Sequence, residues 1–146
     1  MSIKETIEHN IIIAMKAHNQ EELDALRMAR AALKNEEIAL GHDVDEPEMQ
    51  KVLQKLIKQR REAAEQYKLA SRTNSMDKEL REAALLEQYL PAQMDDATLK
   101  TIIQKVITET GAAGVADTGK VIGAVVKQTQ GQADGTRISQ LVRELL

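Results

Sequence analysis

Residues 117–142 read DTGKVIGAVVKQTQGQADGTRISQLV, and this stretch sets the organisation of the C-terminal third of the 146-residue chain. Apolar residues recur every three or four positions on both sides of a break, which is the period of an amphipathic helix. Gly131 and Gly135 punctuate the break, as glycines do where one element ends and another begins. The pattern predicts two short helices, at about 117–129 and 135–145, joined by a turn. Their apolar positions are Val121, Ile122, Val125, Val126, Ile138, Leu141, Val142 and Leu145.

The composition favours an all-helical, soluble protein. Hydrophobic residues make up 42% of the chain and aromatic residues only 1%, so leucine, isoleucine, valine, alanine and methionine must fill the core. Such a core suits packed helices better than a β-sandwich. There is no cysteine, which excludes disulfides and cysteine-based metal sites. No apolar run approaches the roughly 20 residues of a membrane span, and the N-terminus lacks a secretory signal pattern. We expect a cytoplasmic protein.

Three helices are predicted in the first 70 residues. Ser2 and Glu5 form a capping-box pattern at the start of the first helix. The second ends at Gly41, because glycine readily adopts the left-handed conformation of a helix C-cap. Pro47 opens the third and longest helix, since proline is favoured in a first helical turn.

The third helix carries an apolar stripe with the spacing of antiparallel helix pairs. We therefore expect it to form a long hairpin with the second helix. Arg60 interrupts the stripe, which indicates either a side chain that snorkels to water or an ion pair with an acid of the second helix such as Glu37. The stripe comprises Met49, Val52, Leu53, Leu56, Arg60, Ala63, Tyr67 and Ala70.

A boundary between two parts of the chain follows a fourth helix at roughly 75–90, which Pro91 stops. Beyond a short linker at 91–94, Asp95 is expected to cap a fifth helix. The predicted architecture is all-α with about seven helices. It comprises an N-terminal helical bundle at 1–90 built round the long hairpin, and a small three-helix C-terminal subdomain at 95–146.

The charge of the chain argues against a protein that coats nucleic acid by bulk electrostatics. The formal net charge is −3, whereas such domains usually have a strong basic excess. Residues 99–146 hold six bases against four acids, so the acidic excess lies in the rest of the chain. This asymmetry is small and is typical of ordinary solvated faces.

No catalytic, metal or cofactor site is predicted. The sequence has no nucleophile with a base and an orienting third group, and no phosphate-binding loop of the G-x-x-x-x-G-K-[ST] form. The three histidines lack the spacing of metal ligands. An acidic cluster precedes the third helix, and capping and helix-dipole roles explain it better than a calcium loop does. The cluster comprises Asp43, Asp45, Glu46 and Glu48.

A candidate nucleic-acid-binding group lies in the opening stretch. Lys120 and Lys127 are seven residues apart, so on one helix they share a face about 10 Å apart, a separation that two phosphates match. Arg137 starts the final helix and is a candidate third contact. Gly131 and Gly135 shape a loop that leads into a helix N-terminus, where free N–H groups favour an anion.

A purely structural interpretation of these residues competes with the RNA-binding one. Asp134 is a candidate N-cap that would occupy the free N–H groups with its own carboxylate. Gly119 and Gly123, one turn apart, are consistent with close helix packing, and Gly131 and Gly135 are consistent with helix ends. The sequence leaves both interpretations open.

A second candidate is a basic ridge on the third helix. Lys51, Lys55, Lys58 and Arg61 or Arg60 recur every three or four residues, and Glu62 and Glu65 dilute the positive charge further along the helix. No aromatic residues alternate with them to stack on bases. This disfavours single-strand recognition and favours backbone or shape contacts with folded RNA.

Motifs along nearly the whole chain resemble the YqeY-like family. Its tail domain is shared with the B subunit of glutamine-dependent aminoacyl-tRNA amidotransferases. In the tail, the matching residues are Gly119, Lys120, Gly123, Lys127, Gly131, Ala133 and Gly135. Upstream matches include Leu26-Arg27, Ala31-Ala32-Leu33-Lys34, Lys58-Gln59-Arg60 and Tyr89-Leu90-Pro91-Ala92-Gln93. Thr118 departs from the family pattern, where methionine is commoner, and puts little in doubt because threonine suits a first helical turn.

The resemblance implies an accessory tRNA-binding module, associated with glutamine-dependent carbon–nitrogen ligase activity but without catalysis of its own. The implied partners are tRNA and an amidotransferase-type complex or other partner protein. The alternative is a helical protein-interaction adaptor with no nucleic-acid role. An exposed apolar strip on the hairpin would favour the adaptor, and convergence of Lys120, Lys127 and Arg137 around the glycine loop would favour tRNA binding.

Overall fold

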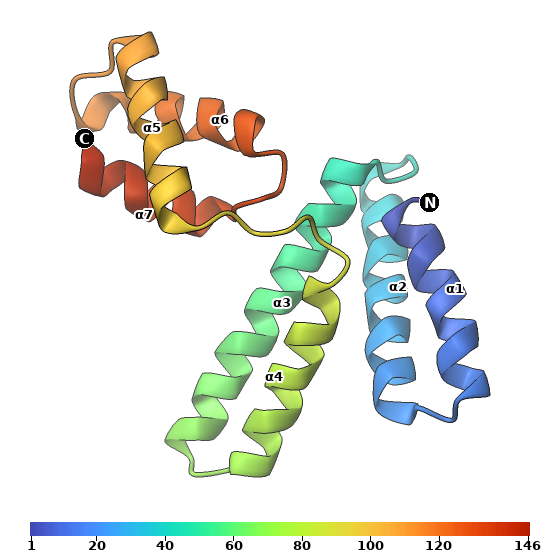
Figure 1. The fold of residues 1–146 in the computed structure, drawn as a ribbon. Helices are drawn as coiled ribbons and strands as arrows, with labels where there is room; N and C mark the ends of the chain where they lie inside the picture. The colour runs from blue at the N-terminus through green and yellow to red at the C-terminus, as the bar shows by residue number, and fades with distance from the viewer. The chain divides into compact units, whose positions relative to one another are not determined.

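The computed structural model describes all 146 residues and confirms an all-α protein. Seven α-helices and one short 3-10 helix follow one another without a strand (Figure 1). The chain divides into two compact units, Met1–Leu90 and Pro91–Leu146. The elements are α1 (Ile3–Lys16), α2 (Gln20–Leu40), α3 (Glu46–Leu69), α4 (Thr73–Glu87), α5 (Asp96–Thr110), η1 (Val115–Asp117), α6 (Thr118–Thr129) and α7 (Gly135–Leu145).

Local capping sets most helix ends where the sequence predicts them. Ser2 and Glu5 form the expected capping box at α1, with each side chain bonded to the other residue's backbone N–H. Asp45 caps α3 in a second capping box with Glu48, so the acidic turn has the predicted capping role. Gly41 ends α2 in the left-handed conformation, at φ 76°. These caps satisfy backbone groups that the helix itself leaves unpaired.

The pairing of helices in the N-terminal unit differs from the predicted hairpin. The most extensive contact of α3 is with α4, and α1 pairs with α2, while the contact between α2 and α3 is small. Both pairs lie side by side in Figure 1. The prediction that α3 forms its long hairpin with α2 is therefore wrong. The turn between α3 and α4 is short, and the small residues Ala64 and Ala83 are buried on them, which favours close approach of these two helices.

Arg60 shows why the pairing matters. Its Nε donates to Glu82 of α4 at 2.9 Å, and Glu79 of the same helix lies 3.8 Å away. The predicted partner Glu37 instead accepts from Lys4 at 2.7 Å and from Lys34 at 3.4 Å. Hydrogen bonding by Lys4 holds the pKa of the Glu37 carboxyl below its ordinary value. The ion-pair interpretation of Arg60 is correct in kind and wrong in its partner.

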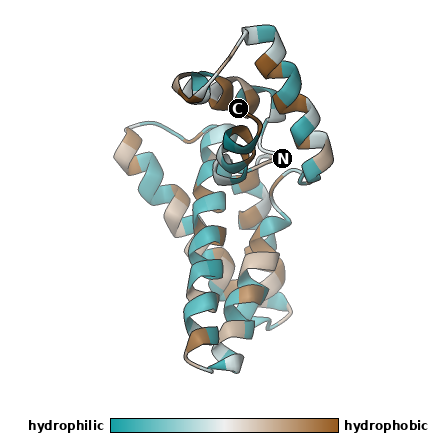
Figure 2. Ribbon diagram, turned by 90° about the vertical axis from the view of Figure 1, so that its left-hand side faces the viewer, coloured by the Kyte–Doolittle hydropathy of each residue, from teal (hydrophilic) through white to brown (hydrophobic).

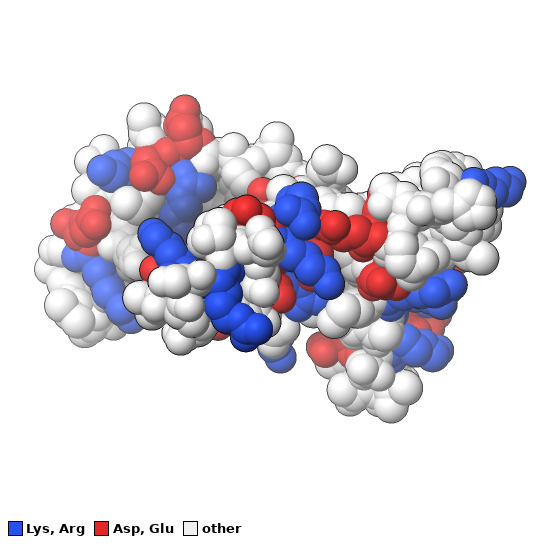
Figure 3. Space-filling view, turned by 90° about the horizontal axis from the view of Figure 1, so that it is seen from below, with Lys and Arg blue, Asp and Glu red and all other residues white.

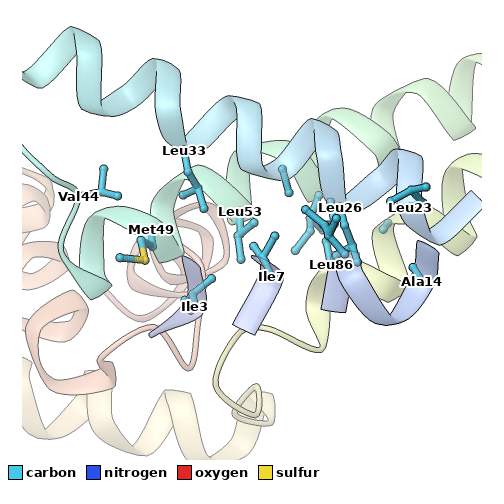
Figure 4. Packing of buried hydrophobic residues seen from close by; sticks show 14 residues of the cluster. Ile3, Ile7, Ala14, Leu23, Leu26, Leu33, Val44, Met49, Leu53 and Leu86 are labelled. Carbon is cyan, nitrogen blue, oxygen red and sulfur yellow. The ribbon is translucent and has the colours of Figure 1, made fainter. Parts of the chain in front are cut away.

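The core of the N-terminal unit is aliphatic and draws on all four helices (Figure 4). Ile7 of α1, Leu26 of α2, Leu53 of α3 and Leu86 of α4 are almost completely buried. Tyr89 packs at the edge of this core, where its hydroxyl accepts a 2.7 Å hydrogen bond from the Asn10 amide. Burial raises the pKa of the Tyr89 hydroxyl.

The C-terminal unit has a separate core formed by α5, α6 and α7. Its fully buried members are Leu99, Ile103, Val106, Val121, Val125, Ile138 and Val142. Asp95 caps α5 by accepting from the backbone N–H of Thr98, and Gly111 ends it, as the sequence predicts. Hydropathy along the ribbons is mixed rather than uniformly apolar on any helix (Figure 2). None of the helices combines the length and the hydrophobicity that a membrane-spanning segment requires.

Replacement of a core leucine tests the packing of the N-terminal unit. We expect Leu53→Ala to lower the free energy of unfolding by about 2–5 kcal/mol, because it leaves a cavity between α3 and its neighbours. Leu80→Ala in α4 is the matched control, since Leu80 is 44% exposed whereas Leu53 is fully buried. Urea denaturation followed by circular dichroism measures both. Equal losses in the two variants would contradict this core.

Titration of Asp95 tests the cap of α5. Hydrogen bonding by Thr98 holds the pKa of the Asp95 carboxyl below its ordinary value of 3.8. A lowered pKa contributes stability that is present above the unfolded-state pKa and is lost as the pH falls through the folded-state pKa. Asn caps helices as well as Asp but does not titrate. We therefore expect Asp95→Asn to lose less thermal stability than the wild type between about pH 4 and pH 2. Identical pH profiles would contradict the assignment.

Candidate nucleic-acid interface

The exposed face of α6 carries Lys120 and Lys127. Both side chains are exposed, and their spacing of seven residues places them on one face about 10 Å apart along the axis. The ion pairs of the C-terminal unit are Lys105 with Glu109 and Arg137 with Asp96, so neither lysine has a carboxylate within 4.0 Å. The opposite face of the helix packs into the core through Val121 and Val125. Two unpaired cations thus stand on the solvent side of a fixed helix.

Gly119 and Gly123 lie on the same exposed side and do not serve helix packing. A Cβ atom added to either would meet nothing within 4 Å, and neither has a positive φ. The interpretation that they allow close approach of another helix in this unit is therefore wrong. Glycine within a helix costs stability relative to alanine, by roughly 1 kcal/mol at an interior position. Nothing inside the unit compensates for that cost at Gly123.

Arg137 is held inside the C-terminal unit rather than projecting beside the two lysines. Its guanidinium donates to the Asp96 carboxylate at 2.8 Å and to the carbonyl oxygen of Met94. Its backbone N–H donates to Asp134, which caps α7. The side chain therefore ties the start of α7 to the start of α5. The structure brings Arg137 together with Asp96 and does not leave it as a free cation.

The loop between α6 and α7 is a left-handed turn that is hydrogen-bonded to residues 93–94. Gln130 and Gly131 adopt left-handed conformations, at φ 46° and 85°, and turn the chain out of α6. The carbonyl oxygen of Gly131 accepts from the Gln93 amide, and that of Gln132 accepts from the backbone N–H of Met94.

Gly135 begins α7, and Asp134 occupies the adjacent cap position, as the structural interpretation of the sequence predicts. Gly131 therefore lies in the turn after α6, and Gly135 is the first residue of α7. The N-terminus of α7 is already capped by the Asp134 carboxylate, which accepts from the backbone N–H of Arg137.

Sequence reasoning missed the part that residues 93–96 play in this loop. Gln93 and Met94 bind the loop backbone, and Asp96 binds Arg137, although roughly forty residues separate the partners. Asp96 is marked in the sequence only as an acid in the first turn of a helix, where such residues are common. No spacing signal identifies its partner.

All four residues of the predicted ridge on α3 are exposed, but they differ in their ion pairing. Lys51, Lys55 and Lys58 are exposed and have no carboxylate within 4.0 Å. Arg61, the fourth predicted member, forms an ion pair with Glu87 of α4. The unpaired part of the ridge therefore consists of the three lysines.

A further cluster of polar side chains lies between α2 and α4. A depression of about 280 Å³ between α2 and α4 has Glu21 and Arg81 in its wall, and these two side chains form an ion pair at 2.8 Å. Hydrogen bonding by Arg81 lowers the pKa of the Glu21 carboxyl. The structure has no group of three His, Asp or Glu side chains placed to hold a metal ion.

Acidic and basic side chains are interspersed on the face that Figure 3 shows, so that face is not uniformly basic. An interaction with a polyanion would therefore depend on local clusters such as the lysines of α6 and α3 rather than on a bulk field.

Comparison with known proteins identifies one family. The sequence profile described as Yqey-like protein matches residues 4–146, nearly the whole chain. No curated protein matches the chain.

Substitution of Gly123 tests whether its glycine has an internal role. We expect Gly123→Ala to raise the free energy of unfolding by up to about 1 kcal/mol, because alanine is the better helix former and its Cβ meets open space. Thermal and urea denaturation measure the change, with Gly41→Ala as the contrasting variant, since Gly41 has a positive φ and should lose stability. Destabilisation by Gly123→Ala would show that the fold itself requires this glycine.

Proposed function

This chain belongs to the Yqey-like protein family, and from that premise we propose that it is an accessory RNA-binding module that contacts tRNA through the exposed face of α6. In this role it contributes binding, and the carbon–nitrogen ligase chemistry associated with tRNA amidation belongs to amidotransferase subunits. Lys120 and Lys127 contact phosphates of the RNA backbone.

One observation carries this proposal: the exposed face of α6 combines two unpaired lysines with two glycines that have open space above them. Lysine ammonium groups bind phosphates as point charges. Because glycine has no Cβ atom, nothing covers the helix backbone at these positions, and a bulky ligand can approach the backbone closely. The stability that Gly123 sacrifices is consistent with selection for binding rather than for folding.

Arg137, Gly131 and Gly135 have a supporting part in the proposal. A phosphate would have to displace Asp96 from the Arg137 guanidinium, whereas Lys120 and Lys127 have no such competitor. We infer that these three residues hold the loop and the start of α7, which fixes the C-terminal end of α6 next to them.

The alternative adaptor function has less support. The exposed large apolar residues of α1 and α2 form short groups rather than a regular series along either helix. Ile12 has the exposed Met15 three residues after it, but Glu8, His9 and Lys16 hold the other positions one turn away, so the apolar group does not continue along the helix. A groove-binding partner helix requires apolar anchors at a regular i, i+3, i+4, i+7 spacing. The residues concerned are Ile12, Ile13, Met15, Met28, Ile38 and Leu40.

Removal of the α6 lysines tests the proposal directly. We expect Lys120→Ala/Lys127→Ala to weaken binding to total tRNA and to make the plot of log K against log salt less steep. The decrease in slope should be about 1 to 2, since each lost phosphate contact contributes about 0.7–0.9. Filter binding at several KCl concentrations measures the slope.

The matched control is Lys100→Ala/Arg143→Ala, which removes two exposed bases from the same unit, neither of them in an ion pair. It should leave the slope close to that of the wild type. Arg137→Ala should mainly lower the stability of the C-terminal unit. If the control and the α6 variant lose binding equally, net charge and not the α6 face is responsible. Binding that is undetectable at low salt would exclude the RNA-binding function.

A further inference from the structure

The three lysines of α3 form a separate surface, which we call the basic ridge: Lys51, Lys55 and Lys58. All three are exposed on one side of the helix, opposite the buried Leu53 and Ile57. From Lys51 to Lys58 the helix rises about 10 Å. The basic ridge belongs to the N-terminal unit, whereas α6 belongs to the C-terminal one.

Glu48 lies one turn before Lys51 and Glu62 one turn after Lys58, but neither forms an ion pair with a ridge lysine. Lys55 has Lys51 four residues before it and Lys58 three residues after it, and like charges at these spacings destabilise a helix by a few tenths of a kcal/mol per pair. Two other basic residues of the same helix form ion pairs with α4. Arg60 and Arg61 follow directly after Gln59, and both are bound by carboxylates of α4. The basic ridge is left without such a partner.

The surroundings of the ridge favour one class of ligand. Binding to a lipid surface by an amphipathic helix requires apolar side chains beside the charges, and protein interfaces usually have buried aromatic or apolar anchors. The side chains between the three lysines on this face are instead polar, as with Gln54 and Gln59. With no aromatic side chain there, base stacking is also disfavoured. A row of ammonium groups alone suits a row of phosphates.

We propose that the basic ridge is a second phosphate-binding surface, which contacts the sugar–phosphate backbone of a folded nucleic acid independently of α6. It goes beyond the function proposed above, because it assigns a binding role to the N-terminal unit. Where both surfaces engage one RNA, the second contact becomes intramolecular, and the affinity of the whole chain exceeds that of either surface alone.

The experiment uses the full chain and total tRNA as the probe. Lys51→Gln/Lys55→Gln/Lys58→Gln removes the ridge charges while keeping helix propensity similar. Its matched control, Lys16→Gln/Lys68→Gln/Lys78→Gln, changes the net charge equally at exposed, separated positions of the same unit. The charge-retaining variant replaces the three ridge lysines by arginine. Circular dichroism verifies that all three variants keep the helical content of the wild type.

We expect the glutamine variant of the ridge to lower the slope of log K against log salt by about 2 to 3 and to weaken tRNA binding about tenfold or more at moderate salt. The matched control should bind nearly as the wild type does, and the arginine variant should retain binding. An unchanged slope in the glutamine variant, or equal losses in the matched control, would overturn the proposal. Ridge-dependent binding to phosphatidylserine–phosphatidylcholine vesicles without ridge-dependent tRNA binding would also overturn it.

The experiments can reject the α6 proposal and the ridge proposal independently of each other. If Lys120→Ala/Lys127→Ala binds tRNA as the wild type does while the ridge variant does not, the α6 proposal is wrong and the ridge proposal stands. The reverse result rejects the ridge and supports α6.

Discussion

In the C-terminal unit, polar contacts of Arg137 join the start of α7 to the start of α5, beside the aliphatic core that the three helices share. The guanidinium binds both the Asp96 side chain and the Met94 carbonyl oxygen, so one residue joins α7 to the segment that opens α5. The neighbouring backbone bonds between residues 93–94 and the loop at 131–132 reinforce the same junction. α6 lies between this loop and η1 along the chain, and its Val121 and Val125 pack into the core of the same unit. Arg137 is the cation of this structural contact, and the lysines of α6 take no part in it.

Local chemistry made the helices predictable, whereas their partners were not. Ser2, Gly41, Asp95 and Gly111 define helix ends through interactions within a few residues, and such signals are readable in the sequence. The hairpin assigned to α2 and α3 was wrong because the periodic stripe of α3 gives the face that is buried but not the helix that covers it. The predicted partner of Arg60 was wrong for the same reason. An ion pair with a carboxylate was predictable, but whether that carboxylate is Glu82 or Glu37 depends on which helices are in contact.

The candidate site also has features that the sequence predicts and features that it does not. Exposure and spacing of Lys120 and Lys127 follow from helical period alone. The engagement of Arg137 and Arg61 does not, because Asp96 and Glu87 reach them from other elements. Arg60, Arg61 and Arg137 are each paired with a carboxylate of another helix, whereas the lysines of the two candidate surfaces have no such partner. This division fits the chemistry of the side chains, since the guanidinium makes directional, multidentate contacts and the ammonium is a strongly hydrated point charge.

Tyr89, which is hydrogen-bonded to Asn10 at the edge of the N-terminal core, is an internal fluorescent probe. The chain has no tryptophan, and its only tyrosines, Tyr67 and Tyr89, both lie in the N-terminal unit. Tyrosine emission therefore reports the N-terminal unit alone, whereas far-ultraviolet dichroism sums the helices of both units. Divergence of the two signals during denaturation would show that the units unfold as separate cooperative blocks, and a single shared transition would show that they are thermodynamically coupled.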